Sequence, residues 1–151
     1  MADTAPLISV IVPAYNDTMR MALCLDMLLA QSIGDQTEII VVDNPSTDDM
    51  TSLQRRYPMV RWLYEPTPGS YAARNTGIAA ARRRILAFTD SDCLPPADWL
   101  EHGIAPLRYI QLRWRAVNLV TSRLTGLSPA ELLTWPPGSH GITLSNKCIS
   151  Q

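Results

Sequence analysis

Short apolar runs alternate along this chain with segments of helical periodicity. The runs lie at residues 7–12, 38–43, 60–64 and 85–88, and each is short and apolar enough for a strand that is buried on both faces. The segments between them end near residues 31, 57 and 81 and have the spacing of helices. Because these elements alternate with short connections, we predict an α/β fold: a mostly parallel sheet with helices on both faces.

The ends of the helices carry recognisable signals. Asn16 or Asp17 can cap the first helix, and Ser46 with Asp49 resembles a capping box for the second. The pattern is looser after Pro96, where we expect a helix at 97–107, a strand at 116–124, a short helix at 128–134 and a last strand at 141–149.

Polar residues gather where the predicted strands end, at 13–16, 43–44, 65 and 90–92. In open parallel sheets, ligands bind outside the carboxyl ends of the strands. Asp90 and Asp92 are separated only by Ser91, directly after a buried strand. Two carboxylates at this spacing repel each other unless a cation lies between them, so the pair suits a hard divalent ion completed by substrate phosphates. A solvated turn with Asp as turn residues is the alternative.

Composition excludes several classes of protein. The 151 residues suffice for one domain, and a net charge of −1 implies no nucleic-acid partner. The three cysteines show no CxxC spacing, so a zinc site is not indicated. We see no secretory signal at the first residues and no apolar run of membrane-spanning length, and we expect a cytoplasmic protein.

Four stretches, taken together and in this order, resemble a known family: SVIVPAYN (9–16), IIVVDNPSTDD (39–49), GSYAARNTGI (69–78) and FTDSDCLPPADWL (88–100). They are similar to the N-terminal, nucleotide-sugar-binding part of family-2 glycosyltransferases, which have the GT-A fold. The resemblance covers essentially the whole chain. It implies one GT-A-like domain over 1–151, with the donor-binding part at 1–107 and the start of an acceptor-side part at 108–151.

The resemblance also implies roles for individual residues. Asp90 and Asp92 would hold Mg²⁺ or Mn²⁺ on the donor diphosphate, and Arg74 would neutralise phosphate charge. Asp43 would accept hydrogen bonds from the base or ribose. The remaining donor-binding residues implied are Pro13, Ala14, Tyr15, Asn44, Asn75 and Ser91.

The implied reaction is inverting transfer of a sugar from a UDP-, GDP- or dTDP-sugar to a carbohydrate or lipid-linked acceptor, as in cell wall or polysaccharide biosynthesis. Such an enzyme would be cytoplasmic or peripheral at the inner membrane face, and self-association is compatible with it. Asn44 and Pro45 depart from the residues that many relatives carry, so base contacts can differ.

Family members usually carry their general base, an acid, after the segment at 141–149, so we expect the acceptor-side half to be missing and the catalytic residue to be absent. Asp98 and Glu101 are acids in range, but nothing marks either as the base. The alternative function is therefore an inactive nucleotide-sugar-binding or interaction domain. Sugar nucleotidyltransferases and nicotinamide dehydrogenases are disfavoured because no Gly-rich loop follows the first predicted strand.

Overall fold

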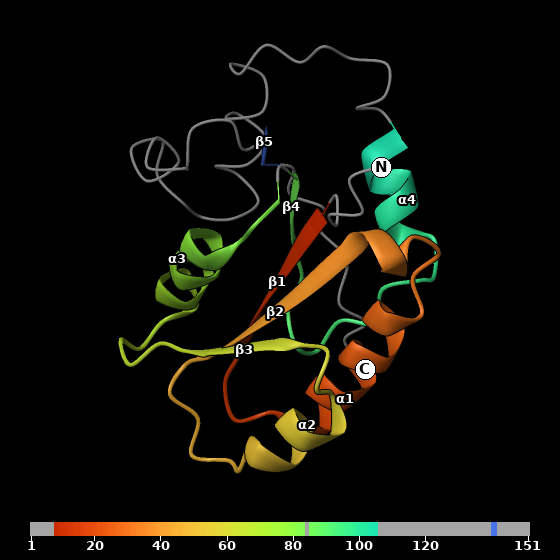
Figure 1. The fold of residues 1–151 in the computed structure, drawn as a ribbon. Helices are drawn as coiled ribbons and strands as arrows, with labels where there is room; N and C mark the ends of the chain where they lie inside the picture. The colour runs from red at the N-terminus through yellow and green to blue at the C-terminus, as the bar shows by residue number, and fades with distance from the viewer. Residues whose placement is uncertain (1–7, 84, 106–139, 142–151) are drawn as a thin grey trace.

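A parallel sheet forms the centre of the protein, in a computed structural model that describes residues 8–83, 85–105 and 140–141 (Figure 1). The strands lie in the order β3-β2-β1-β4-β5. The elements are β1 (Ile8–Ala14), α1 (Thr18–Leu29), the short 3₁₀ helix η1 (Gly34–Gln36), β2 (Thr37–Asp43), α2 (Thr51–Arg56), β3 (Arg61–Tyr64), α3 (Ser70–Ala80), β4 (Ile85–Phe88), α4 (Trp99–Ile104) and β5 (His140–Gly141).

The central strand is β1, and all seven of its residues are buried. It pairs in parallel with β2 from Ile8↔Thr37 to Ala14↔Asp43, and on its other side with β4 from Ile8↔Ile85. The chain first runs outward from β1 through β2 to β3, and then returns to add β4 on the opposite side. The strand order therefore reverses between β1 and β4, which is where an open α/β sheet forms a crevice for ligands.

The predicted helix cover on both faces is confirmed. Alternate strand residues such as Val10 and Val41 form one core with buried side chains of α1, α2 and α4. The intervening strand residues, among them Ile11 and Ile40, pack with Ile78 and Ala73 of α3 on the other face. This division follows from the period of two along a strand, which sends neighbouring side chains to opposite faces.

Helix α3 approaches the sheet closely at Gly77. A Cβ atom at this position would lie 2.5 Å from Cγ2 of Ile11, a side chain that is fully buried. Carbon atoms pack at about 3.5–4.0 Å, so only glycine allows this approach. The contact fixes the height of α3 above β1.

Asp17 caps α1, as predicted: its carboxylate accepts a hydrogen bond from the Arg20 amide at 3.3 Å. The predicted Ser46–Asp49 capping box is wrong. Helix α2 begins only at Thr51, Asp49 accepts from the Thr51 amide, and the Ser46 hydroxyl accepts from the backbone of Asn16 instead. Hydrogen bonding by the Thr51 side chain, and secondarily by the Thr51 amide, holds the pKa of Asp49 below its usual value.

The other predicted elements agree with the structure to within a few residues where it describes them. Helix α4 begins two residues later than the predicted start at 97. The predicted strand at 116–124, the helix at 128–134 and all but the first residue of the strand at 141–149 lie outside the described residues. Within the described ranges, no helix is both long enough and apolar enough to cross a bilayer.

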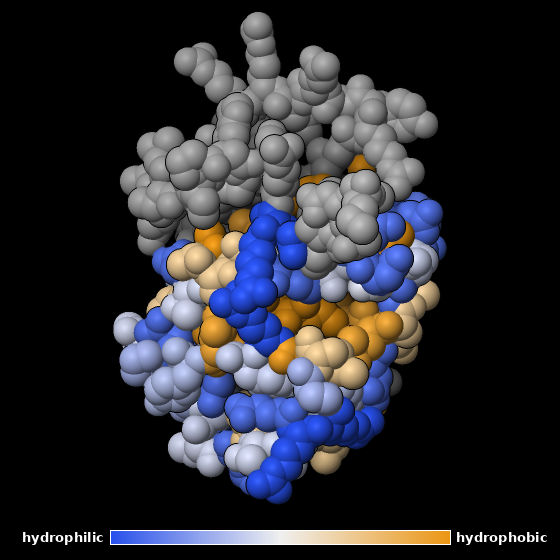
Figure 2. All heavy atoms as spheres, viewed as in Figure 1, coloured by the Kyte–Doolittle hydropathy of each residue, from blue (hydrophilic) through white to orange (hydrophobic). Residues whose placement is uncertain are grey.

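The molecular surface around β3 is mixed in character. Figure 2 shows hydrophobic residues reaching the surface in the middle of one face, while hydrophilic residues cover the end that carries α2. Strand β3 is the edge strand on this side, and its side chains are only partly buried or exposed.

Candidate functional site

A cavity of about 630 Å³ opens at the carboxyl ends of β1, β2 and β4, at the reversal of strand order. The residues that line it come from the end of β1, from the loops after β1, β2, β3 and β4, and from the first residue of α3: Pro13, Ala14, Tyr15, Asp17, Asn44, Pro45, Pro68, Gly69, Ser70, Asp90, Ser91 and Asp92. Segments that are far apart in the sequence thus meet at one site.

Most of the donor-binding residues predicted from the sequence line this cavity, with the exceptions of Asp43, Arg74 and Asn75. The Asp43 carboxylate accepts a hydrogen bond from the Ser46 amide at 3.0 Å and shapes the loop after β2. Asn75 is exposed on α3. Arg74 reaches the site indirectly through Asp90.

The two acids after β4 can provide a pair of oxygen ligands. Carboxylate oxygens of Asp90 and Asp92, together with Sγ of Cys93, lie within 4.8 Å of one another. Oxygen ligands lie about 2.0–2.1 Å from a Mg²⁺ ion, so two carboxylates with oxygens within 4.8 Å of each other are candidates to bind the same ion. Sulfur is a softer ligand than the oxygens that Mg²⁺ and Mn²⁺ prefer.

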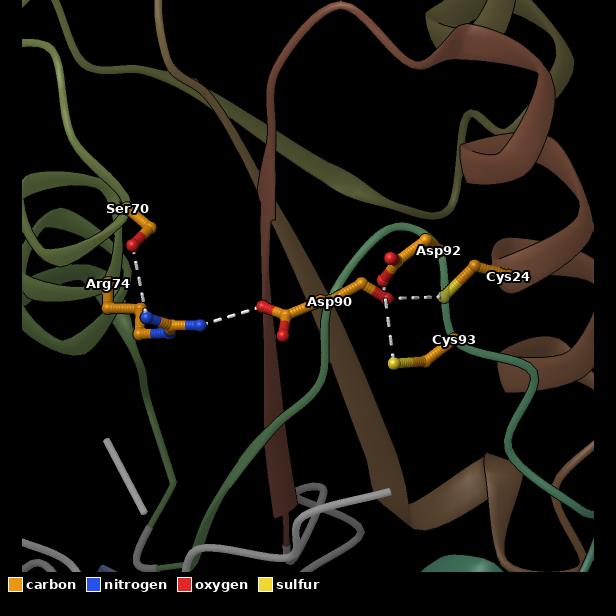
Figure 3. A network of polar contacts seen from close by, with 6 residues as sticks. All are labelled: Cys24, Ser70, Arg74, Asp90, Asp92 and Cys93. Atoms are coloured by element: carbon orange, nitrogen blue, oxygen red, sulfur yellow. Dashed lines mark hydrogen bonds and ion pairs between the residues drawn. The ribbon is translucent and has the colours of Figure 1, made fainter. Parts of the chain in front are cut away.

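Arg74 is paired with one of these acids. Its Nη2 lies 2.7 Å from Oδ1 of Asp90, and the Arg74 side chain is 16% exposed while that of Asp90 is 50% exposed. Figure 3 shows the Asp90 carboxylate pointing toward α3 and Arg74, whereas Asp92 and Cys93 lie on the side that faces Cys24 of α1. The ion pair joins α3 to the loop after β4 and places a positive charge beside the cavity.

Cys24 supports the same loop from behind. Its Sγ lies 3.6 Å from the backbone oxygen of Asp90. Burial, and secondarily the negative charges of Asp92 and Asp90, raise the pKa of the Cys24 thiol to about 12. Such a thiol stays protonated at neutral pH, so Cys24 is a packing residue.

Asn16 joins the loop after β1 to the loop after β2. Its Oδ1 accepts hydrogen bonds from the Thr47 amide at 2.6 Å and from the Asp48 amide at 3.3 Å. Its backbone has a φ of +46°, a conformation that asparagine tolerates better than most residues. The side chain therefore holds two rims of the cavity together.

Asn44 makes a similar connection to the loop after β3. Its amide nitrogen donates to the backbone oxygens of Glu65 at 3.1 Å and Thr67 at 2.6 Å, and its Oδ1 accepts from the Gly69 amide at 2.8 Å. Asn44 is only 4% exposed. All three contacts are to backbone groups of one segment that leads into α3.

Glu65 ties this segment to the body of α3. One carboxylate oxygen accepts from the Thr76 hydroxyl, and the other accepts from the Thr67 amide at 2.8 Å. These hydrogen bonds favour the ionised form and hold the pKa of Glu65 below its usual value.

The acids at the start of α4, Asp98 just before the helix and Glu101 within it, do not line the cavity. Glu101 accepts a hydrogen bond from the Ser32 hydroxyl at 2.8 Å, and Asp98 is 3.3 Å from a ring nitrogen of His102. Between them, the buried side chain of Gln31 donates to the Pro96 oxygen at 2.7 Å and accepts from the Leu100 amide at 3.0 Å. The end of α1 thus anchors the segment that follows Asp92.

Several lining residues were not assigned to the site from the sequence, namely Asp17, Pro45, Pro68, Gly69 and Ser70. Gly69 and Ser70 begin one of the four stretches that resemble the family, but no role was predicted for either residue. The signal that could have identified them is the presence of glycine at position 69, because a backbone φ of +126°, which this residue adopts, is accessible mainly to glycine. Helix α3 begins there without a side-chain cap, so its first amide groups remain available at the cavity.

Comparison with known proteins identifies relatives of this chain. Glycosyltransferase AglE of Haloferax volcanii is 40% identical over 113 residues, which are 71% of this chain and 37% of that protein. The structure of Staphylococcus aureus TarS 1–349 in complex with UDP-GlcNAc matches with a TM-score of 0.63 and 27% identity, over 68% of this chain and 31% of TarS 1–349. Mannosyltransferase PcManGT from Pyrobaculum calidifontis, in complex with GDP-Man and Mn²⁺, matches with a TM-score of 0.60 and 32% identity, over 68% of this chain and 32% of the enzyme.

The chain spans about a third of the length of these relatives. The sheet order, the cover of helices on both faces and these matches confirm the predicted GT-A fold. The model of the family described as glycosyl transferase family 2 matches residues 9–127, which is most of the sequence. The chain therefore belongs to glycosyl transferase family 2.

Proposed function

We propose that this chain binds the nucleotide-sugar donor of a glycosyltransferase that transfers the sugar to an acceptor with inversion and with the help of a divalent metal ion. The observation that carries the proposal is the cavity at the reversal of strand order, with Asp90, Ser91 and Asp92 on its wall. The relatives solved with UDP-GlcNAc or with GDP-Man and Mn²⁺ support a donor of this class.

The residues that line the cavity differ in chemistry. Pro13, Ala14 and Tyr15 from β1 and its loop offer apolar surface and an aromatic ring, and Tyr15 is 62% exposed. A flat nucleotide base can pack against such a surface, with the Tyr15 ring as a stacking partner. The uncapped first turn of α3 offers amide donors for oxygen atoms of the nucleotide.

Asp90 and Asp92 are the residues that would hold Mg²⁺ or Mn²⁺. The bound ion would neutralise the diphosphate and stabilise the nucleoside diphosphate as it leaves the sugar. Arg74 holds the Asp90 carboxylate through one oxygen and contributes a fixed positive charge next to the phosphates. Asp43, predicted to contact the base or ribose, and Asn75, predicted to lie near the diphosphate, remain predictions, since neither lines the cavity.

The general base is assigned to none of the described acids. Asp17 lines the cavity, but its carboxylate caps α1 and lies 3.6 Å from Nε of Arg20. Asp98 and Glu101 are engaged on α4 away from the cavity. A general base acts in the transfer to an acceptor and not in donor binding, so donor binding can be tested without an acceptor.

The test is calorimetry of UDP and GDP binding in Mn²⁺ and in EDTA. We expect at least one nucleotide to bind more tightly in Mn²⁺, and Asp92→Asn to remove that difference. The matched control is Asp98→Asn, the same change at an acid of α4 outside the cavity, which should keep it. Equal affinity in Mn²⁺ and EDTA would contradict the metal role, and no binding of either nucleotide would contradict the donor site.

A further inference from the structure

We infer that Asn44 is a positioning residue of the donor site: its side chain sets the distance between the two walls of the nucleotide cavity. The inference rests on the proposed function, and it gives Asn44 a role that requires no direct contact with the nucleotide. One wall is the end of β1 with Ala14, and the other is the segment from Pro68 to Ser70 that starts α3.

Asn44 is bonded to both walls. Its backbone amide donates to the oxygen of Ala14 at 2.9 Å, so its main chain continues the pairing of β1 and β2. Its side chain reaches the other way and bonds to Glu65, Thr67 and Gly69. The residue thus spans from the central strand to the loop that carries the opposite wall.

The pattern of these bonds suits an amide and not a carboxylate. Two of the three require the side chain to donate, and they end on backbone oxygens. A carboxylate at this position would have no hydrogen to donate, and it would place negative charge beside both carbonyl oxygens in a setting that is 4% exposed. An aspartate here would therefore release the loop even though its shape is nearly that of asparagine.

The third bond acts on a special backbone. Gly69 has a φ of +126°, and its amide donates to Oδ1 of Asn44 at 2.8 Å. The next residue, Ser70, is the first of α3 and lines the cavity. By holding Gly69 in this conformation, Asn44 fixes where the uncapped amide groups of α3 point.

Both hydrogens of the Asn44 amide are directed to the loop, so its contribution to nucleotide binding passes through the loop. The inference therefore separates Asn44 from residues that touch the ligand. Loss of the amide should loosen the loop in the free protein and weaken nucleotide binding in consequence.

The experiment compares the wild-type chain with Asn44→Asp and with Gln54→Glu, the same amide-to-acid change at an exposed position of α2. Amide hydrogen exchange at Gly69 is measured without ligand, and UDP and GDP affinities are measured by calorimetry in Mn²⁺. We expect Asn44→Asp to speed exchange at Gly69 and to lower affinity by about tenfold or more, the usual effect of losing hydrogen bonds of this kind. Gln54→Glu should change neither.

A second variant covers the case in which Asn44→Asp does not fold. Gly69→Ala disturbs the same connection from the loop side, because alanine rarely adopts the φ of Gly69 although its Cβ would meet nothing within 4 Å. It should reproduce both effects, and where Asn44→Asp folds, the double variant should lose less affinity than the sum of the two single changes.

Three results would overturn the inference. Weaker binding with unchanged exchange at Gly69 would mean that Asn44 touches the nucleotide directly. Faster exchange with unchanged affinity would mean that it only stabilises the loop. Binding of neither nucleotide by the wild-type chain would refute the proposed function and this role with it, whereas the first two results refute the role of Asn44 alone.

Discussion

Replacement of Gly77 by alanine tests the close approach of α3 to the sheet. In an exposed helix this change stabilises by about 1 kcal/mol, because alanine has the higher helix propensity. Here the new Cβ would lie 2.5 Å from Cγ2 and 3.2 Å from Cγ1 of Ile11. Relief of the clash requires α3 to move away from β1 by about 1 Å, since carbon contacts lie at about 3.5–4.0 Å.

The two effects oppose each other, and their sizes decide the sign. Overpacking of a core costs typically about 1–3 kcal/mol, and the fully buried Ile11 cannot swing into solvent. After subtraction of the propensity gain, we expect Gly77→Ala to lower the free energy of unfolding by up to about 2 kcal/mol. Urea unfolding of the chain measures this value.

Two further variants make the measurement specific. Ala79→Gly, at an exposed position of the same helix, should cost about 1 kcal/mol and calibrates the propensity. Ile11→Ala removes the two γ carbons that the new Cβ would meet most closely, so Gly77→Ala should be much less harmful in that background. An increase in stability on Gly77→Ala in the wild-type background would refute the packing argument.

Three other predictions concern single polar groups. The lowered pKa of Glu65 stabilises the folded state, and this contribution is complete above the usual pKa of 4.5 and is lost as the pH falls through the lower folded-state pKa. Thr76→Val removes a hydrogen bond that lowers this pKa, so the urea midpoint of the variant should decrease less than that of the wild type between about pH 5 and pH 3. Cys24, with its pKa raised to about 12, should resist iodoacetamide at pH 8 in the folded protein and react only after unfolding, as mass spectrometry would show; rapid labelling of native protein would contradict its burial. Tyr57→Phe removes hydrogen bonds to Asp26 and to the Ala22 backbone and should cost about 1–2 kcal/mol in urea unfolding, whereas an unchanged midpoint would mean that water replaces them.

The sequence was most informative about buried strands. The predicted range of β4 agrees with the structure at both ends, because a run that is apolar on both faces stops sharply at polar Thr89 and Asp90. The start of α2 was harder to predict, since Ser46 and Asp49 have the same side chains whether they cap a helix or hold a loop. Ser46 is used by Asn16, thirty residues earlier in the chain, and no local pattern can indicate that contact.

In the candidate site too, some features could be predicted from the sequence, whereas contacts between distant segments could not. Asp90 and Asp92 were predicted because they follow a buried strand directly, whereas Pro13, Ala14 and Tyr15 were predicted from the resemblance to the family. The partnership of Arg74 with Asp90 depends on α3 packing beside β4, and the role of Asn44 depends on where the loop after β3 passes. Such contacts arise from the three-dimensional path of the chain, so they could not be predicted from spacing along it.

The central place of β1 has a consequence for the order of folding. Its pairing with β2 joins neighbours in the sequence, whereas its pairing of Ile8 with Ile85 must close a segment that contains α1, α2 and α3. Because closing a longer loop costs more entropy, we expect β1, β2 and β3 to associate before β4 docks. Pulsed hydrogen exchange during refolding would then protect amides of β2 earlier than those of β4, and simultaneous protection would argue against it. The loop with Asp90 and Asp92 reaches its place only at the second step, so early folding species would have no cavity at the ends of β1, β2 and β4. Under the proposed function, a nucleotide added during refolding would stabilise only the late species.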